Sequence, residues 1–196
     1  MQLLLVTLIA ICPLTYASTW RQLSSNAPWS GRSDPQLVEL HGKRILLGGH
    51  ENRNYYNDVW ESADGGRLWR QLLLSAPLAP HSYRMAKCQN GHVFLMGGHN
   101  AGTWFNDVWS SEDGLSWEQI TSNAESWQPR AAAALQIRGA DGQMFLMGGS
   151  TSFLKPIGNG TVLNDVWASR DAGKRWSLVT ASAPWPAREY WNILVH

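Results

Sequence analysis

The sequence predicts an all-β fold, an incomplete β-propeller with three complete four-stranded blades and strands of a further blade. Three observations support this prediction: a repeat of about fifty residues, an apolar run ending in Gly-Gly in every repeat, and the lack of any helical periodicity. Solenoid repeats are shorter than this, whereas propeller blades have this length. A blade is a small antiparallel sheet that buries its faces against its neighbours.

Tryptophan marks the repeat most clearly. The chain has 196 residues and 12 tryptophans, of which only Trp104 and Trp191 lie outside the repeat scheme. The tryptophan that opens the last strand of each unit stands at positions 20, 69, 117 and 176, in steps of 49, 48 and 59 residues. Large aromatic side chains favour strands and supply buried area between stacked sheets.

Each repeat contains the same predicted strands. The second strand is a continuous apolar run that ends at a Gly-Gly pair, as expected for a strand covered on both faces. The third strand begins with Asn-Asp-Val-Trp. The Gly-Gly pairs are Gly48-Gly49, Gly97-Gly98 and Gly148-Gly149, and the third strands begin at Asn57, Asn106 and Asn164. We place the complete blades at residues 32–74, 84–122 and 130–181, and strands of a further blade at 18–24 and 188–196.

An acidic turn links the third and fourth strands of every repeat. Its pattern is Ser-x-Asp-x-Gly-x-x-Trp in the first and third repeats and one residue shorter in the second. In such a turn the carboxylate accepts backbone N–H bonds, glycine supplies a positive φ, and the tryptophan packs down. We therefore interpret these residues as structural: Ser62, Asp64, Gly66 and Trp69; Asp113 and Trp117; Ser169, Asp171, Gly173 and Trp176.

The Gly-Gly pair followed by Asn-Asp-Val-Trp resembles the kelch repeat, and the acidic turns resemble Asp-boxes, also called BNR repeats. The resemblance covers residues 18–196 and implies a partial kelch-type β-propeller similar to that of galactose oxidase. Propellers of this kind host oxidases, mutarotases and pure binding modules, so the resemblance predicts the fold more sharply than the function.

Residues 1–17 are predicted to be a signal peptide. An apolar run over residues 3–14 is too short to span a bilayer, and small residues precede a cleavage point after Ala17. The alternative is a buried N-terminal strand. We expect a secreted protein, extracellular or periplasmic according to the organism, without a membrane partner after cleavage. Asn159, in Asn-Gly-Thr, is a potential glycosylation site, and Cys88 is interpreted as a small buried hydrophobe, with a reactive thiol as the alternative.

Charge and architecture limit the partners. With 16 basic and 15 acidic residues the net charge is +1, and no basic stripe is present, so nucleic acid is excluded as an expected partner. Three blades alone would expose two large apolar faces. We therefore expect either missing blades, in a longer propeller, or self-association to close the ring.

Candidate ligand-binding residues lie on one loop face. Because strands alternate in direction, the loops between second and third strands and the loops between blades emerge together, opposite the acidic turns. An arginine before each first strand could ring the mouth of the channel and attract carboxylates, and nearby tryptophans could stack on sugars. The alternative is that each arginine pairs with an acidic neighbour and each tryptophan packs between blades. The candidates are Arg32, Arg84, Arg130, Arg188, Trp29, Trp127, Trp185, His50 and His99.

Two functions remain open from the sequence. The first is a secreted module that binds a protein or carbohydrate ligand through the Arg/Trp face and the irregular loop at 150–163. The second is a fragment of a glycan-active enzyme of the sialidase, mutarotase or oxidase kind. The sequence contains no pattern for catalytic residues, a cofactor or a metal site, and His50 and His99 have no evident third ligand.

Overall fold

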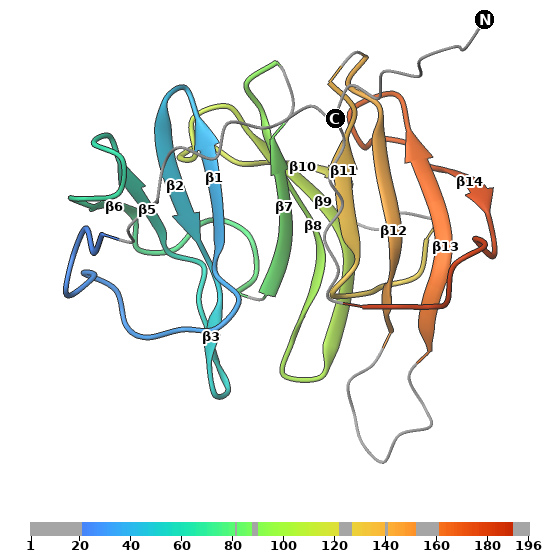
Figure 1. The fold of residues 1–196 in the computed structure, drawn as a ribbon, viewed down its shortest axis with the longest axis horizontal. Coiled ribbons are helices and arrows are strands. Elements are labelled where there is room, and N and C mark those ends of the chain that lie inside the picture. The colour runs from blue at the N-terminus through green and yellow to red at the C-terminus, as the bar shows by residue number, and fades with distance from the viewer. Residues whose placement is uncertain are drawn as a thin grey trace, which may run out of the picture.

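Three four-stranded antiparallel sheets stand side by side in the computed structural model, which confirms the predicted incomplete propeller (Figure 1). The structure describes residues 21–80, 82–87, 90–121, 127–139, 141–151 and 161–189, and for residues 83–87 it describes the backbone alone. Within these ranges every regular element is a strand. The three sheets follow one another along the chain, and we call them blades 1, 2 and 3.

Blade 1 has the strand order β1-β2-β5-β6, and the loop between β2 and β5 forms a separate hairpin of β3 and β4. Its strands are β1 (Gln36–Leu40), β2 (Lys43–Leu47), β3 (His50–Glu51), β4 (Asn54–Tyr55), β5 (Val59–Ser62) and β6 (Arg70–Leu73).

Blades 2 and 3 have the same order, and their central strands continue unbroken into the long hairpins. Blade 2 consists of β7 (Ser82–Lys87), β8 (Val93–Asn100), β9 (Thr103–Ser111) and β10 (Glu118–Thr121). Blade 3 consists of β11 (Ala134–Ile137), β12 (Met144–Ser150), β13 (Val162–Ser169) and β14 (Ser177–Thr180).

The first strands β1, β7 and β11 lie next to one another at the centre of the arrangement. Two apolar cores fill the spaces between blades. One joins Ile45, Leu47 and Val59 of blade 1 to Leu95 of blade 2. The other joins blades 2 and 3. Its buried residues include Phe94, Met96, Val108, Trp127, Met144, Leu146 and Trp176. Each blade is therefore stabilised mainly by burial against its neighbours.

The Gly-Gly pairs allow the chain to pass close to the following loop. Gly49 has φ 89° and Gly149 has φ 91°, which favour glycine. A Cβ atom on Gly149 would lie 2.7 Å from the carbonyl oxygen of Ala131. In blades 2 and 3 the register between the central strands also shifts at these pairs, as in a β-bulge.

The strand predicted at residues 18–24 is not found in its described part. Residues 21–24 belong to no strand. A strand needs neighbours to receive its backbone hydrogen bonds, and residues 21–24 pair with none of the described strands. Residues 188 and 189, at the start of the other predicted strand, are likewise irregular.

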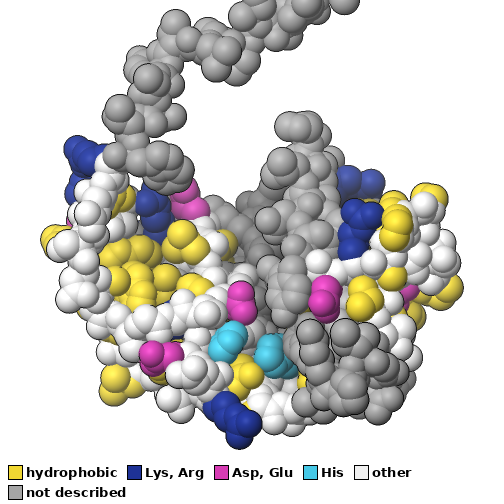
Figure 2. Space-filling model, turned by 60° about the horizontal axis from the view of Figure 1, so that its bottom comes forward, with side chains coloured by type: hydrophobic (Ala, Val, Ile, Leu, Met, Phe, Trp, Pro, Cys, Tyr) yellow, Lys and Arg dark blue, Asp and Glu magenta, His cyan; other side chains and the backbone are white. Residues whose placement is uncertain are grey.

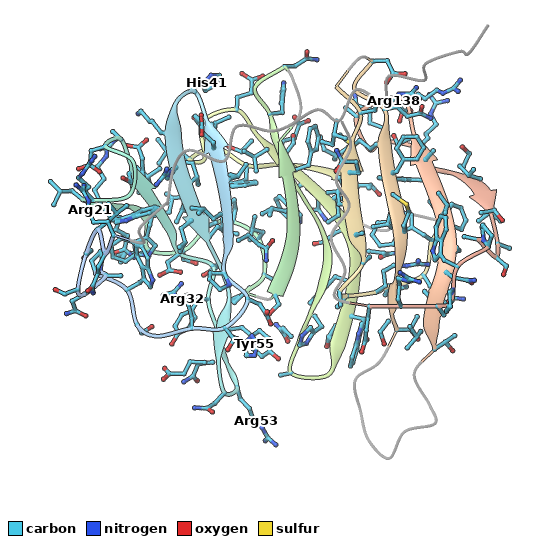
Figure 3. All side chains as sticks on the ribbon, in the orientation of Figure 1. Arg21, Arg32, His41, Arg53, Tyr55 and Arg138 are labelled. Carbon is cyan, nitrogen blue, oxygen red and sulfur yellow. The ribbon has the colours of Figure 1, made fainter. Side chains whose placement is uncertain are left out.

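Loops emerge at two opposite faces, as strand alternation predicts. Figure 3 shows His41 and Arg138, in turns after first strands, at one end, and Arg53 and Tyr55, in the β3–β4 hairpin, at the other. We call the second of these the hairpin face and the first the turn face. Residues 1–17, Cys88, Asn159 and most of the 150–163 loop lie outside the described residues.

Candidate functional site

Two of the candidate arginines are held inside the protein. Arg32 Nη1 and Nη2 donate to Asp58 Oδ1 and Oδ2 at 2.6 and 3.0 Å, and Arg130 makes the same bidentate pair with Asp165 at 2.6 and 2.9 Å. Each arginine side chain is 2 % exposed. Each Nη1 also donates to the first glycine of the following Gly-Gly pair. These guanidinium groups link the loop before a blade to its third strand, and they are engaged within the protein.

The strand register separates Arg84 from this series. Ser33 faces His50, and Ser82 faces His99 in the same way, so the position equivalent to Arg32 is the residue before Ser82. In the sequence that residue is His81. Arg84 instead faces Met96, further along β7. This corrects the equivalence expected from the sequence, where Arg84 was grouped with Arg32.

Asp107, the third-strand aspartate of blade 2, differs from Asp58 and Asp165 in its hydrogen bonds. Asp107 Oδ2 accepts a bond from Trp109 Nε1 at 2.8 Å, as its counterparts do from their own tryptophans. Its Oδ1 is buried and has no hydrogen-bond partner among the described residues. Burial raises the pKa of the Asp107 carboxyl, and this effect outweighs the hydrogen bond from Trp109, which lowers it.

Arg188 repeats the local part of the arginine pattern. Its Nε donates to the carbonyl of Pro186 at 3.1 Å, as Arg130 Nε does to Gln128. Its backbone N–H donates to Leu163 O, and its carbonyl accepts from Gly149. The residue is exposed, at the edge of blade 3.

The candidate tryptophans pack against the blades. Trp127 is 2 % exposed and lies between blades 2 and 3, with its ring 6.2 Å from that of Trp176. Trp29 is half-buried and meets Trp60 and Trp69 edge to face, at 5.6 and 4.9 Å. Trp185 is half-buried, and its carbonyl accepts from Asn164 Nδ2. A fully buried ring such as Trp127 offers no face to a sugar.

The acidic turns form closed hydrogen-bond networks. In the first, Ser62 Oγ donates to Asp64 Oδ1 at 2.9 Å, Leu68 N donates to the same oxygen at 3.0 Å, and Trp69 Nε1 donates to Gly66 O at 3.1 Å. The hydrogen bond from the Leu68 N–H is the largest influence on the pKa of Asp64, and it lowers that pKa. The turns at Asp113 and Asp171 repeat this arrangement.

Four rings from two blades meet on the hairpin face. His50 stacks on Tyr55 across the β3–β4 pair at 5.3 Å, and His99 stacks on Trp104 across the β8–β9 pair at 5.9 Å. The two pairs touch, because the Tyr55 hydroxyl lies 3.4 Å from His99 Nδ1 and the histidine rings are 6.3 Å apart. We call His50, Tyr55, His99 and Trp104 the His–aromatic cluster. All four side chains are partly exposed.

Polar and charged groups border the His–aromatic cluster. His50 Nδ1 lies 3.1 Å from Ser82 Oγ and 3.9 Å from Asp34 Oδ2. Glu51 and Arg53 are exposed in the same hairpin. Figure 2 shows histidine side chains side by side on this face, with acidic and basic side chains nearby. The surface therefore combines flat rings with hydrogen-bonding groups of both signs.

The third blade does not repeat this cluster. Ser150 and Val162 pair at the positions held by His99 and Trp104 in blade 2. Ser150 is 1 % exposed and Val162 39 % exposed. The cluster is therefore a local departure from the repeat, unlike the Arg–Asp pairs and the acidic turns. A residue that each blade needs for stability recurs, whereas a binding site on a repeat scaffold breaks the repetition.

Comparison with known families agrees with this architecture. The KLHDC2/KLHL20/DRC7 Kelch-repeats domain matches residues 15–196. The chain belongs to the kelch-repeat family. No curated protein matches it significantly. Kelch domains are typically protein-binding propellers. In this kelch domain the partly exposed, non-repeating residues on the hairpin face are the strongest candidates for such a contact.

The two histidines of the kelch domain influence each other. Burial lowers the pKa of His99, and the positive charge of His50 lowers it further, while Asp34 acts in the opposite direction. Within the described residues no group of three or more His, Cys, Asp or Glu side chains could hold a metal ion. No helix in the described part of this kelch domain is long and apolar enough to cross a membrane.

Sequence reasoning found the two histidines but missed their aromatic partners. Tyr55 lies in a hairpin that no repeat pattern predicted, since β3 and β4 are separate from the main sheet of blade 1. Trp104 could have been identified from the sequence, because it is one of only two tryptophans outside the repeat scheme. A large aromatic residue that breaks the repeat was a better indicator than the repeated Arg and Trp residues.

Proposed function

We propose that this kelch domain is a secreted protein-binding module whose partner contacts the His–aromatic cluster. The observation that carries the proposal is the meeting of His50, Tyr55, His99 and Trp104 from two blades on one loop face. Aromatic side chains contribute a large contact area at low entropic cost, and they are enriched where protein interfaces gain most of their affinity.

A protein ligand fits this surface better than a sugar bound by the Arg/Trp series. Arg32 and Arg130 are saturated by Asp58 and Asp165, and Trp127 is buried between blades. The cluster instead offers four contiguous rings, a hydroxyl and nearby charges of both signs. Such a mixture of aromatic centre and polar border is typical of a protein interface.

Substitution within the cluster tests the proposal. A partner recovered by cross-linking from the extracellular medium would be purified, and its affinity would be measured for the wild type and for Tyr55→Ala and Trp104→Ala. Loss of an aromatic anchor is expected to weaken binding about 30-fold, corresponding to about 2 kcal/mol. Thermal unfolding of each variant would check that the fold is retained.

Leu68→Ala and Leu115→Ala provide matched controls. Both leucines are exposed, at 76 % and 43 %, in acidic turns on the turn face. These controls are expected to bind like the wild type. Equal binding by the cluster variants and the wild type would contradict the proposal, and so would an equal loss in cluster and control variants.

Secretion rests on residues 1–17, whose apolar run and small residues before Ser18 fit a cleaved signal peptide. The Kelch-repeats match begins only at residue 15. Expression in a secretory host, followed by mass spectrometry of the exported protein, is expected to give an N-terminus at Ser18. Retention inside the cell with residues 1–17 intact would contradict this part of the proposal.

A further inference from the structure

A groove on the turn face lies between blades 2 and 3, away from the His–aromatic cluster. Its volume is about 600 Å³, within the range of small-molecule sites. One wall is the face of blade 2 that packs against blade 3, and the other consists of two turns of blade 3. These are the turn before β12, at Asp141 and Gly142, and the acidic turn after β13, at 170–174.

The floor of the groove is apolar. Phe94 and Met144, 2 % and 1 % exposed, lie beneath its surface, and the accessible apolar surface comes from Ile120, which is partly buried against the same core. These side chains form the end of the core between blades 2 and 3, where the two sheets stop touching. The ring of His92 stacks on that of Phe94 at 6.0 Å and extends this flat surface toward the rim.

The blade 3 rim carries cations without an ion-pair partner among the described residues. Arg170 and Lys174 are exposed and line the groove, and no salt bridge is formed by either in this part of the chain. Two acids on the same blade 3 rim are already engaged, whereas Glu118 lines the opposite, blade 2 wall. Asp141 pairs with Arg138, which lowers the pKa of Asp141 to about 2, and Asp171 accepts bonds from Ser169 and from the backbone of Arg175.

The equivalent space between blades 1 and 2 contains side chains that pair with one another. There Glu61 binds Lys43 at 2.9 Å and Arg70 at 2.8 Å, so the wall neutralises its own charges. His41 crosses to blade 2, with Nε2 3.2 Å from Glu112 O, and its ring closes on Gly91. At the positions of Glu61 and Arg70, blade 2 has Ser110 and Glu118, which face each other across β9 and β10.

Blade 2 thus lacks the side chains that occupy the corresponding space beside blade 1. Ser110 is small and buried, so it leaves room above Phe94. Across the groove, Arg170 stands where blade 2 has Glu112, both following the serine that opens the acidic turn. The groove therefore joins an apolar floor to a rim whose available charge on the blade 3 side is positive.

We infer that this groove binds a small organic anion whose apolar or aromatic part lies on Ile120 and the ring of His92 and whose carboxylate meets Arg170 and Lys174. Charge complementarity selects an acid over a neutral or cationic analogue. The apolar floor selects a ligand with a ring or short chain beside its carboxylate. The site is independent of the protein contact proposed for the hairpin face.

Titration with 3-phenylpropionate, followed by ¹⁵N–¹H NMR, tests the site. Shifts are expected at residues 92–96, 118–120 and 170–174, with a dissociation constant on the order of 1 mM for a ligand of this size. The amide and amine analogues, 3-phenylpropanamide and 3-phenylpropylamine, are expected to bind at least about tenfold more weakly because they lack the anion. A second titration with the acetyl-Phe-Glu-amide dipeptide distinguishes a peptide source of the same chemistry from a free acid.

Charge variants localise the anion. Arg170→Gln and Lys174→Gln are each expected to weaken 3-phenylpropionate binding about fivefold, and because both residues are exposed the fold should not change. Arg67→Gln removes the same charge from the equivalent turn of blade 1. Its side chain is exposed and does not line the groove, so binding should be retained.

Binding of either acid that depends on Arg170 and Lys174 supports the inference and identifies the source. Four results would overturn it: no shifts in the groove with either acid, equal affinity for the acid and its amide, an equal loss in Arg67→Gln, or no loss in either Arg170→Gln or Lys174→Gln. The hairpin face can be tested separately on the same protein, so failure here leaves the protein contact unaffected.

Discussion

Blades 1 and 2 share one sheet topology, yet they differ at three equivalent places. In blade 1 the third-strand aspartate, Asp58, is paired with Arg32, whereas Asp107 in blade 2 has no cation beside it among the described residues. Blade 1 neutralises Glu61 with two basic side chains, whereas blade 2 has Ser110 at that place. On the hairpin face His50 pairs with Tyr55 in blade 1, and His99 with Trp104 in blade 2.

The difference shows how a repeat protein can acquire sites without changing its fold. The backbone of each blade is maintained by strands, Gly-Gly pairs and acidic turns, which recur. Side chains that neutralise one another in blade 1 have no counterpart among the described residues of blade 2, where one carboxylate oxygen of Asp107 lacks a hydrogen-bond partner and a groove is open. Since neighbouring blades contribute most of the stability, such local losses can be tolerated.

The largest expected difference concerns the third-strand aspartates. Asp58→Asn leaves the buried Arg32 guanidinium without its counter-ion, and breaking such a pair costs about 3–5 kcal/mol of unfolding free energy. Asp107→Asn keeps an acceptor for Trp109 and removes a carboxyl whose ionisation burial disfavours, so the expected loss is below about 1 kcal/mol. Urea unfolding of both variants at neutral pH measures the contrast. Equal losses would show that the arginine is not the cause of the difference.

A smaller effect is expected at the next strand pair. Glu61→Gln removes the ion pairs to Lys43 and Arg70, whose side chains are 46 % and 69 % exposed, so the expected loss is about 1 kcal/mol. The Glu61 pKa is lowered: burial, the largest influence, raises it, but Lys43 and Arg70 together outweigh burial. The contribution is therefore present above the unfolded pKa and lost as pH falls through the folded value.

Glu118→Gln, in blade 2, is the matched control for Glu61→Gln. Glu118 is exposed and forms no salt bridge within the described residues, so unfolding free energy should change by less than about 0.5 kcal/mol at any pH. Urea unfolding between pH 3 and pH 7 would compare the two variants. A pH-independent loss in Glu61→Gln would contradict an ionic origin.

The smallest effect concerns the two histidines, and it links the two blades. Because the folded pKa of His99 lies below its unfolded value near 6.5, the unfolded state binds the proton more readily, and stability falls as pH drops below that value. Burial is the main cause, and His50 is the second. His50→Gln is therefore expected to return the His99 pKa part of the way toward 6.5. An NMR titration of the His99 ring protons checks this, and an unchanged pKa would show that burial alone sets it.

The repeated part of the architecture could be predicted from local patterns. The apolar runs before Gly48, Gly97 and Gly148 became second strands in all three blades, and the Asn-Asp-Val-Trp segments lie in or lead directly into third strands. The loop faces also followed from strand alternation. These features depend on residues close together in the chain, and their recurrence in three repeats supports each assignment.

The site could be predicted only in part. His50 and His99 were identified from their place after Gly-Gly, but their contact with Tyr55 and Trp104 depends on how two hairpins of different blades approach each other. Arg84 shows the limit of alignment by motif. In the sequence His81 stands at the position equivalent to Arg32, and Arg84 lies three residues further along, inside β7, as the pairing of Ser82 with His99 reveals.

By itself the sequence determined the main strands of the three blades and their acidic turns, because these follow from short-range periodicity and from the turn preferences of glycine and aspartate. Tertiary structure alone decided which charges are neutralised, which rings meet and where a groove stays open. Those outcomes depend on strand register and on the packing of one blade against the next, which bring together residues from different repeats.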